Sequence, residues 1–361
     1  MNGIDLSRFE FDYDTTWQAF FLDANLNVYS RYGGRDEESA ESRLSKESLL
    51  TTMREVLEVH QRRREVDRAA TSDNAAISRQ TRQVGPRDRR GETDSDFHPP
   101  SGESTIPEDI PLLKAAHQGC VHCHQIQEYR HLQAFHEKKF SRELLFGFPL
   151  PENVGIRFDR EHGHKIVEIL AGAAAAKAGL TTGDVVTQVD DVPIHSEQDF
   201  RWALHRVTTS DQLAVTAVRF GKDMTAFETL RVKLVLSPAW RQTELGWRKS
   251  LRSVPLALGF LAYSLGREER RSAKFPEDRL AIKVVSIRGE GLASNVSLKK
   301  GDLIVQLEGN SSRRTFEEFQ SDLIRLHAPG DRVQMTVLRD GKSVNLEGRF
   351  PDWNSTTTTV P

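Results

Sequence analysis

The C-terminal half of the chain repeats one pattern of residues, and this repeat restricts the fold more than any other feature of the sequence. Leu180-Thr-Thr-Gly-Asp-Val-Val186 corresponds to Leu298-Lys-Lys-Gly-Asp-Leu-Ile304, and Arg219-Phe-Gly-Lys222 corresponds to Arg339-Asp-Gly-Lys342. The copies stay 118 to 120 residues apart over this span. A constant offset between matching segments indicates two copies of one domain. Each copy runs from a strand through a small-residue turn and a short helix to Leu-x-x-Gly-Asp, then to a strand, a polar turn, a helix and a hairpin.

Three short segments of the first copy indicate the domain type: Ala178-Gly-Leu180, Gly183-Asp184 and Pro193-Ile194. They match the pattern of bacterial PDZ domains, so the repeat resembles a tandem pair of these domains over residues 150–240 and 250–351. The second copy departs from the pattern, with Asn295-Val-Ser297 and Asn310-Ser311 at two of these places. The resemblance implies a multidomain α+β chain with two PDZ-like β-sandwich or barrel domains that carry short helices.

PDZ domains bind an extended peptide as an added strand, while a glycine-containing loop directs backbone N–H groups at the peptide carboxylate. The groove residues implied by the resemblance are Val154, Gly155, Ile156, Phe200 and Leu204 in the first copy, and Leu258, Gly259, Phe260, Phe319 and Leu323 in the second. The first three in each copy form the loop, and the last two lie on the opposite helix. The helix residues suit a core position equally well, because any helix buries one apolar stripe. The expected partners are protein C-termini or extended peptides.

The two loop glycines are 104 residues apart, which is less than the offset of the repeat. The second copy must therefore hold extra residues after its loop. The sequence places them at Gly266–Pro276 and its neighbours, a segment rich in arginine and glutamate. Such an insertion beside the groove either restricts which ligands enter or is a solvated loop.

Both cysteines of the chain lie in Cys120-Val-His-Cys-His124, the spacing at which haem is attached covalently to a protein. In that arrangement Cys120 and Cys123 bond to the haem vinyl groups, and His124 coordinates the iron. Apolar residues at helical spacing on both sides predict a small helical module over residues 108–149. The first hypothesis for this module is therefore covalent haem c.

Other ligands suit the same part of the chain. Cys120, Cys123, His131 and His136 supply two thiolates and two imidazoles, a ligand set typical of tetrahedral zinc. A disulfide between the two cysteines and a pair of reduced thiols are further alternatives. The residue types alone leave haem, zinc and no ligand open.

The N-terminal residues predict a β-hairpin followed by a helix. Strand-like runs at Trp17–Asp23 and Asn27–Gly33 flank a short turn, and apolar residues at helical spacing extend from Ser45 to Arg63. This order resembles the second half of a thioredoxin-like domain over residues 1–63, without the half that carries the redox cysteines. A lone hairpin and helix is marginally stable. We therefore expect either a truncated start or docking of this segment on something else.

Composition limits the partners. The formal net charge is -2, so no overall field attracts nucleic acid. The chain contains no apolar run of about 18 residues that would span a membrane, and its start lacks the pattern of a secretory signal. Residues 64–107 predict a disordered polar linker, and residues 352–361 a disordered tail. The location stays unknown, or is extracytoplasmic if the N-terminus is truncated and haem is attached.

Two further features bear on function. PDZ pairs often accompany serine proteases of the high-temperature-requirement type, yet Gly309-Asn-Ser-Ser312 lies at a turn of the repeat and predicts no nucleophile. The order of segments resembles bacterial multidomain proteins with thioredoxin-like and PDZ domains. We therefore expect a non-enzymatic peptide-binding scaffold that positions a redox or metal centre at the cysteines. A c-type haem electron-transfer protein and a thiol oxidoreductase without its catalytic half are the alternatives.

Overall fold

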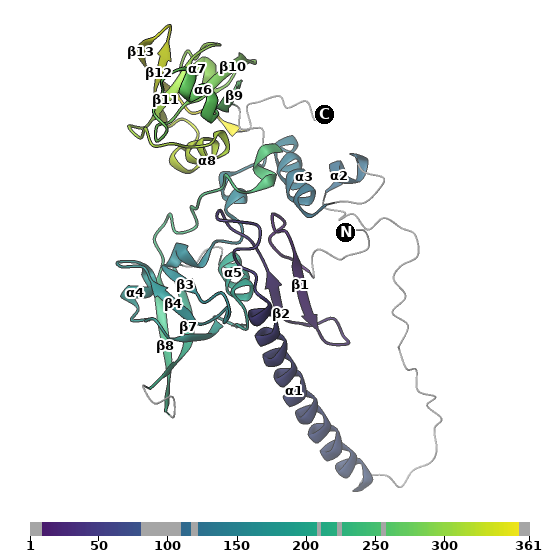
Figure 1. The fold of residues 1–361 in the computed structure, drawn as a ribbon. Coiled ribbons are helices and arrows are strands. Elements are labelled where there is room, and N and C mark those ends of the chain that lie inside the picture. The colour runs from purple at the N-terminus through teal and green to yellow at the C-terminus, as the bar shows by residue number, and fades with distance from the viewer. Residues whose placement is uncertain are drawn as a thin grey trace.

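The computed structural model describes residues 9–80, 110–116, 122–207, 211–221, 226–253 and 258–353. In chain order these residues form a β-hairpin with a long helix, a group of short helices, and the two copies of the repeated domain (Figure 1). In this described part of the chain, no helix is long and apolar enough to cross a membrane.

The N-terminal segment begins with the predicted hairpin. Strand β1 (Gln18–Leu22) pairs antiparallel with β2 (Val28–Gly33). The Asp23 carboxylate accepts backbone N–H bonds across the turn, from Asn25 at 2.8 Å and from Asn27 at 2.9 Å. An aspartate at the start of a turn stabilises it in this way because its side chain replaces a backbone acceptor.

Helix α1 (Lys46–Gln80) extends past its expected end at Arg63 and into the predicted linker. Ser45 caps it by accepting the N–H of Ser48 at 3.0 Å. The extension packs on nothing at Val66, whose side chain is 67% exposed. Arginine, glutamate and alanine favour a helix even without packing, so a charged composition alone did not distinguish a solvated helix from a coil. The remainder of the predicted linker and almost all of the predicted tail lie outside the described residues.

The two copies share one order of elements, apart from one short strand in the first copy and one short helix in the second. The first consists of β3 (Ile156–Phe158), β4 (Ile166–Ile169), α4 (Ala174–Lys177), β5 (Val185–Val189), β6 (Val192–Pro193), α5 (Glu197–Arg206), β7 (Gln212–Phe220) and β8 (Phe227–Val235). The second consists of β9 (Phe260–Ser264), α6 (Arg267–Ser272), β10 (Ile282–Ile287), α7 (Leu292–Asn295), β11 (Leu303–Leu307), α8 (Phe316–Leu326), β12 (Arg332–Arg339) and β13 (Lys342–Arg349). The strand orders are β3-β4 and β6-β5-β7-β8 in the first copy, and β13-β12-β11-β10-β9 in the second. Helix α6 lies in the predicted insertion and has no counterpart in the first copy.

The Gly-Asp step of the repeat is held by the same ion pair in both copies. The Asp184 carboxylate receives two hydrogen bonds from Arg219, at 2.7 and 2.8 Å. Asp302 receives two from Arg339, at 2.8 and 2.7 Å. A bidentate pair fixes both the distance and the orientation of its two partners, so it joins the turn before β5 or β11 to the following hairpin. This shared contact explains why the two sequences match at both places.

The predicted helical module contains α2 (Pro111–Ala116), α3 (Cys123–His136) and a 3-10 turn (Arg142–Phe146). Two further 3-10 turns, Pro151–Val154 and Lys249–Ser253, flank the first copy. Helix α3 is divided between two apolar clusters. Ile126 packs with Phe11 of the N-terminal arm, whereas Phe135 belongs to the core of the second copy. There Phe135 stacks on Phe140 at 3.8 Å, and Phe140 lies 5.8 Å from Trp353. The module therefore shares its apolar packing with its neighbours.

The hairpin docks on α5 of the first copy. Strand β2 lies beside α5 in Figure 1, and Asp199 of α5 accepts hydrogen bonds from the Ser30 hydroxyl at 2.6 Å and the Arg31 N–H at 2.8 Å. The Arg31 guanidinium lies 3.8 Å from the ring of Trp202. Docking of this segment, as expected, is observed. The hairpin gains from α5 the packing that it lacks alone.

Buried charges fix the N-terminal arm in place. The Asp12 carboxylate lies 2.6 Å from Arg201 Nη2 on α5 and 2.7 Å from Arg248 Nη1 in the connector between the copies. All three side chains are buried. Neighbouring Asp14 accepts two bonds from Ser250, at 2.8 and 2.6 Å. Burial disfavours the charged form of Asp12, but the two guanidinium groups outweigh it and hold its pKa below the usual 3.8.

Removing this carboxylate tests whether the arm is part of the fold. Asp12→Ala leaves two buried guanidinium groups without their shared counter-charge, which costs about 3–5 kcal/mol of unfolding free energy. Urea unfolding followed by circular dichroism measures the loss. Glu37→Ala, at an exposed position of the same segment, is the control and should shift stability by less than about 0.5 kcal/mol. A small effect of Asp12→Ala would show that the arm is not tightly docked.

Candidate peptide-binding grooves

Each copy has one edge strand that faces a helix. In the first copy β3 pairs with β4 alone, and in the second β9 is the edge strand of the five-stranded sheet. Helix α8 contacts β9, and α5 contacts the 3-10 turn that precedes β3. An edge strand offers unpaired backbone groups on which a peptide can add as a further strand. The two candidate grooves therefore lie between β3 and α5 and between β9 and α8.

The predicted glycine loops lie at the start of these edge strands. Gly155 has a φ of 88°, and a Cβ at this position would lie 2.1 Å from the Cβ of Ala173. Gly259 has a φ of 69°, and its Cβ would lie 3.2 Å from the carbonyl oxygen of Glu290. Both positions need glycine, because the left-handed backbone and the close approach each disfavour a side chain. Within the two loops, Val154, Ile156, Leu258 and Phe260 are buried.

The four residues predicted for the helix walls are all buried in the domain cores: Phe200, Leu204, Phe319 and Leu323. They hold each helix on its sheet, which was the alternative for them. The groove sides of the helices carry other residues. Glu197 of α5 lines a cavity together with Phe158 of β3, and Phe316 of α8 lies 6.2 Å from Phe260 of β9. Glu197 and Phe316 stand at the first position of their helices, a position that apolar periodicity does not single out.

Two segments, residues 153–233 and residues 265–348, match the PDZ domain family model. Both copies are PDZ domains. We name them PDZ1 and PDZ2. The tandem PDZ pair inferred from the repeat is therefore confirmed.

Curated relatives of the chain are proteases. It is 27% identical over 197 residues to "Probable periplasmic serine endoprotease DegP-like" of Pseudomonas savastanoi pv. phaseolicola, which covers 54% of this chain and 38% of that protein. It is 41% identical over 64 residues to "Serine protease Do-like HtrA" of Lactococcus lactis subsp. cremoris, covering 18% of this chain and 16% of that protein. The chain thus spans well under half the length of these relatives.

Similar solved structures include "HtrA-type protease AlgW with tripeptide", at 14% identity and a TM-score of 0.24, covering 56% of this chain and 68% of that chain. Another is "HtrA-type protease AlgW with decapeptide", at 15% identity and a TM-score of 0.23, covering 39% and 49%. TM-scores this low support no conclusion about this chain.

The cysteine motif is described from His122 onward, so Cys120 lies outside the described residues. Cys123 is half-buried and forms no disulfide with any described residue, and burial raises the pKa of its thiol. His124 Nδ1 lies 2.9 Å from the Glu128 carboxylate. Covalent haem at this motif stays a prediction.

The predicted zinc ligands do not converge. Cys123 begins α3 and His136 ends it, so the rise of 1.5 Å per residue separates them by about 20 Å along the axis. Ligands of one tetrahedral ion must all lie within about 2.0–2.3 Å of it. His131, between them, is buried, and burial lowers its pKa to about 4. The described residues contain no group of three potential ligands arranged for a metal ion. Because Cys123 and His136 lie at opposite ends of one helix, these two residues do not ligate a single ion. Cys120 lies outside the described residues, so a zinc site that includes it stays a prediction.

A carboxylate on α1 joins this helix to PDZ1 through two histidines. Glu55 lies 3.0 Å from His164 Nε2 and 3.1 Å from His195 Nδ1. The other ring nitrogen of His164 lies 3.1 Å from the carbonyl oxygens of Val186 and Ile194. Both His164 nitrogens therefore face acceptors, an arrangement that the doubly protonated imidazolium satisfies.

The pKa values follow from this geometry. Burial lowers the pKa of His164, but its bonds to Glu55 and to the two carbonyls outweigh burial and raise it above 6.5. Burial raises the pKa of Glu55, but the two histidines outweigh it and lower it to about 2. The His164 contribution is thus complete below pH 6.5 and is lost as pH rises through the raised value. The Glu55 contribution is complete above pH 4.5 and is lost as pH falls toward about 2.

Attachment of α1 to PDZ1 should therefore weaken above neutral pH. The unfolding free energy of the native chain is expected to fall as pH rises above 6.5 through the raised pKa of His164, and Glu55→Gln should flatten this fall because the imidazolium loses its partner. Urea unfolding at a series of pH values measures both. His162→Gln, at an exposed histidine nearby, should leave the pH profile unchanged. An unaltered profile in Glu55→Gln would refute the contact.

Proposed function

We propose that this chain is a peptide-binding scaffold in which the groove of PDZ2 binds extended peptides with an apolar C-terminal side chain. The observation that supports it is a difference in one residue at corresponding positions of the two edge strands. Phe158 of β3 is buried beside the PDZ1 groove, where its ring lies 5.0 Å from that of Phe200 in the core. The corresponding residue of β9 is Ala262, which is only partly buried.

A small residue at this point leaves space beneath an added strand. Ala262 lies on the same side of β9 as Phe260, because successive side chains of a strand alternate between its faces. Phe316 of α8 is also partly buried and closes the far side of this space. The site thus has an apolar wall, an unpaired strand edge and a glycine loop at its end, which together suit an apolar side chain beside a terminal carboxylate.

The structure of the turn at Gly309 supports the proposal that its serines do not act as a protease nucleophile. Leu307 and Asn310 pair across the turn, with left-handed backbone at Glu308 and Gly309. The Ser311 hydroxyl accepts a hydrogen bond from Arg279. A serine nucleophile instead needs an adjacent general base. The activity in the relatives' names is therefore not assigned to these residues.

The redox part of the hypothesis rests on sequence alone. Covalent haem at Cys120 and Cys123, with His124 as iron ligand, would make the chain a c-type electron-transfer protein. A thiol oxidoreductase without its catalytic half is the other alternative. An extracytoplasmic location, as in the names of the Pseudomonas relatives, would permit haem attachment. The absorption spectrum after expression with a haem-attachment system decides, because covalent haem gives a Soret band.

The PDZ2 groove can be closed by giving it the residue of PDZ1. Ala262→Phe should weaken binding of fluorescent peptides that end in valine, leucine or phenylalanine by at least about tenfold, or about 1.4 kcal/mol, because the ring occupies the space for the peptide side chain. Fluorescence anisotropy measures the affinity. Amidating the peptide C-terminus should weaken it similarly.

The matched control is Ala214→Phe, the same change at an exposed strand position of PDZ1. It should leave the affinity within about twofold. Equal binding by Ala262→Phe and the native chain would contradict the proposed groove.

A further inference from the structure

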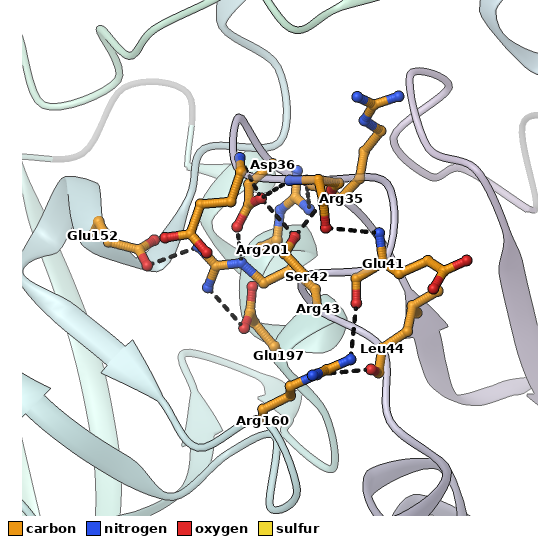
Figure 2. Close-up of polar contacts among 12 residues, drawn as sticks. Arg35, Asp36, Glu41, Ser42, Arg43, Leu44, Glu152, Arg160, Glu197 and Arg201 are labelled. Carbon is orange, nitrogen blue, oxygen red and sulfur yellow. Dashed lines mark hydrogen bonds and ion pairs between the residues drawn. The ribbon is translucent and has the colours of Figure 1, made fainter.

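The groove of PDZ1 is covered by another part of the chain. The connection between β2 and α1, residues 34–45, lies across it and is called here the cover segment. Figure 2 shows this segment beside Glu152, which precedes the glycine loop, and Glu197, which begins α5. A cavity of about 290 Å³ remains beside it, lined by residues of the cover segment, of β3 and of α5.

Arg43 is the central residue of the cover segment. Its guanidinium lies 2.8 Å from the Glu152 carboxylate and 3.1 Å from that of Glu197, so it bridges the loop and the helix that border the groove (Figure 2). Asp36 of the cover segment contacts it at 2.5 Å. The Arg43 side chain is 14% exposed. One cation is thus enclosed by three carboxylates, two of which belong to PDZ1.

Two further arginines hold the backbone of the cover segment. Arg160, just after β3, donates to the carbonyl oxygen of Leu44 at 2.9 Å, and its own carbonyl accepts the Ser45 hydroxyl at 3.1 Å. Arg201 of α5 donates to the carbonyl oxygen of Arg35 at 3.2 Å. The cover segment is therefore bound from β3 and from α5. Among the described residues, β3 pairs with β4 and forms no strand pairing with the cover segment.

The charge of this groove opposes the ligand expected of a PDZ domain. A peptide carboxylate entering beside Gly155 would meet Glu152 and Glu197. Burial raises the pKa of Glu197, and its neighbour Glu152 adds to the increase. Removing Arg43 would leave these carboxylates facing each other in a half-closed site. In PDZ2 the place of Glu197 is taken by Phe316, so the acidic pair is a property of PDZ1.

We propose that PDZ1 is a binding site for an arginine side chain on an internal peptide segment, with the cover segment as its built-in ligand. This inference rests on the proposed function only in treating both grooves as peptide sites. PDZ1 is closed to C-terminal peptides while the cover segment is bound. A partner that enters must present a cation to Glu152 and Glu197 and must compete with a tethered ligand, whose effective concentration is on the order of millimolar.

The test uses the full chain with Ala262→Phe, so that PDZ2 does not contribute. The probe is a fluorescent synthetic peptide of residues 34–48 with blocked termini. The parent should bind it weakly, because the tethered copy occupies the groove. Arg43→Glu should bind it at least tenfold more tightly, because the acidic pair repels its own cover segment. A probe in which alanine replaces Arg43 should bind Arg43→Glu no more tightly than it binds the parent.

Arg54→Glu is the matched control, because it makes the same charge change at an exposed position of α1. It should bind the probe as the parent does. Equal probe affinity in the parent and Arg43→Glu, or equal affinity for the alanine probe, would overturn the proposal.

Amide hydrogen exchange supplies a second measurement that does not depend on probe binding. Residues 34–45 should exchange at least tenfold faster in Arg43→Glu than in Arg54→Glu. Unchanged exchange would show that Arg43 does not hold the cover segment, which refutes the proposal.

Failure of the proposed function is distinguishable. In chains with native PDZ2, Arg43→Glu should leave the affinity for C-terminal peptides at PDZ2 unchanged. If the native chain does not bind C-terminal peptides, but Arg43→Glu still binds the probe more tightly than the parent, the PDZ2 proposal is wrong and the PDZ1 proposal is unaffected.

Discussion

The carboxylate of Asp12 holds the N-terminal half of the molecule together, because two buried guanidinium groups share it as their counter-charge. One of them, Arg201, belongs to PDZ1, and the other, Arg248, belongs to the connector toward PDZ2. Loss of Asp12 would take this buried partner from Arg201 and would leave Arg248 paired with Asp14, at 3.4 Å. This attachment positions the N-terminal arm, and the hairpin, the cover segment and α1 come directly after the arm in the chain. PDZ1 is thus built together with its N-terminal segment.

Local patterns predicted the repeated part well. The Gly-Asp step and the distant arginine matched in both copies because one ion pair fixes them, and the hairpin and the start of α1 follow from alternation and capping. No sequence pattern predicted the docking of β2 on α5. Asp199 and Arg31 are 168 residues apart, and a contact at that separation produces no periodicity in either segment. The occupied groove of PDZ1 was therefore not predictable from spacing.

Two copies of one fold differ here through single side chains. The PDZ1 groove is bordered by Phe158 and Glu197, whereas the corresponding positions of PDZ2 hold Ala262 and Phe316. Sequence patterns identified the glycine loops, but the residues that they assigned to the helix walls of the grooves lie in the domain cores. A pattern of apolar residues indicates burial and does not indicate which surface a ligand contacts. The residue types also matched a tetrahedral zinc site, but helix α3 places Cys123 and His136 at its opposite ends.

The packing of α3 makes PDZ2 a discontinuous domain. Phe135 and Phe140 precede PDZ1 in the chain, yet they complete the core of PDZ2 beside Trp353. A fragment that begins at residue 150 would keep both PDZ sequences and still expose part of the second core to water. The same helix begins with Cys123, so a group bound at this cysteine would be joined to the core of PDZ2 through the length of α3.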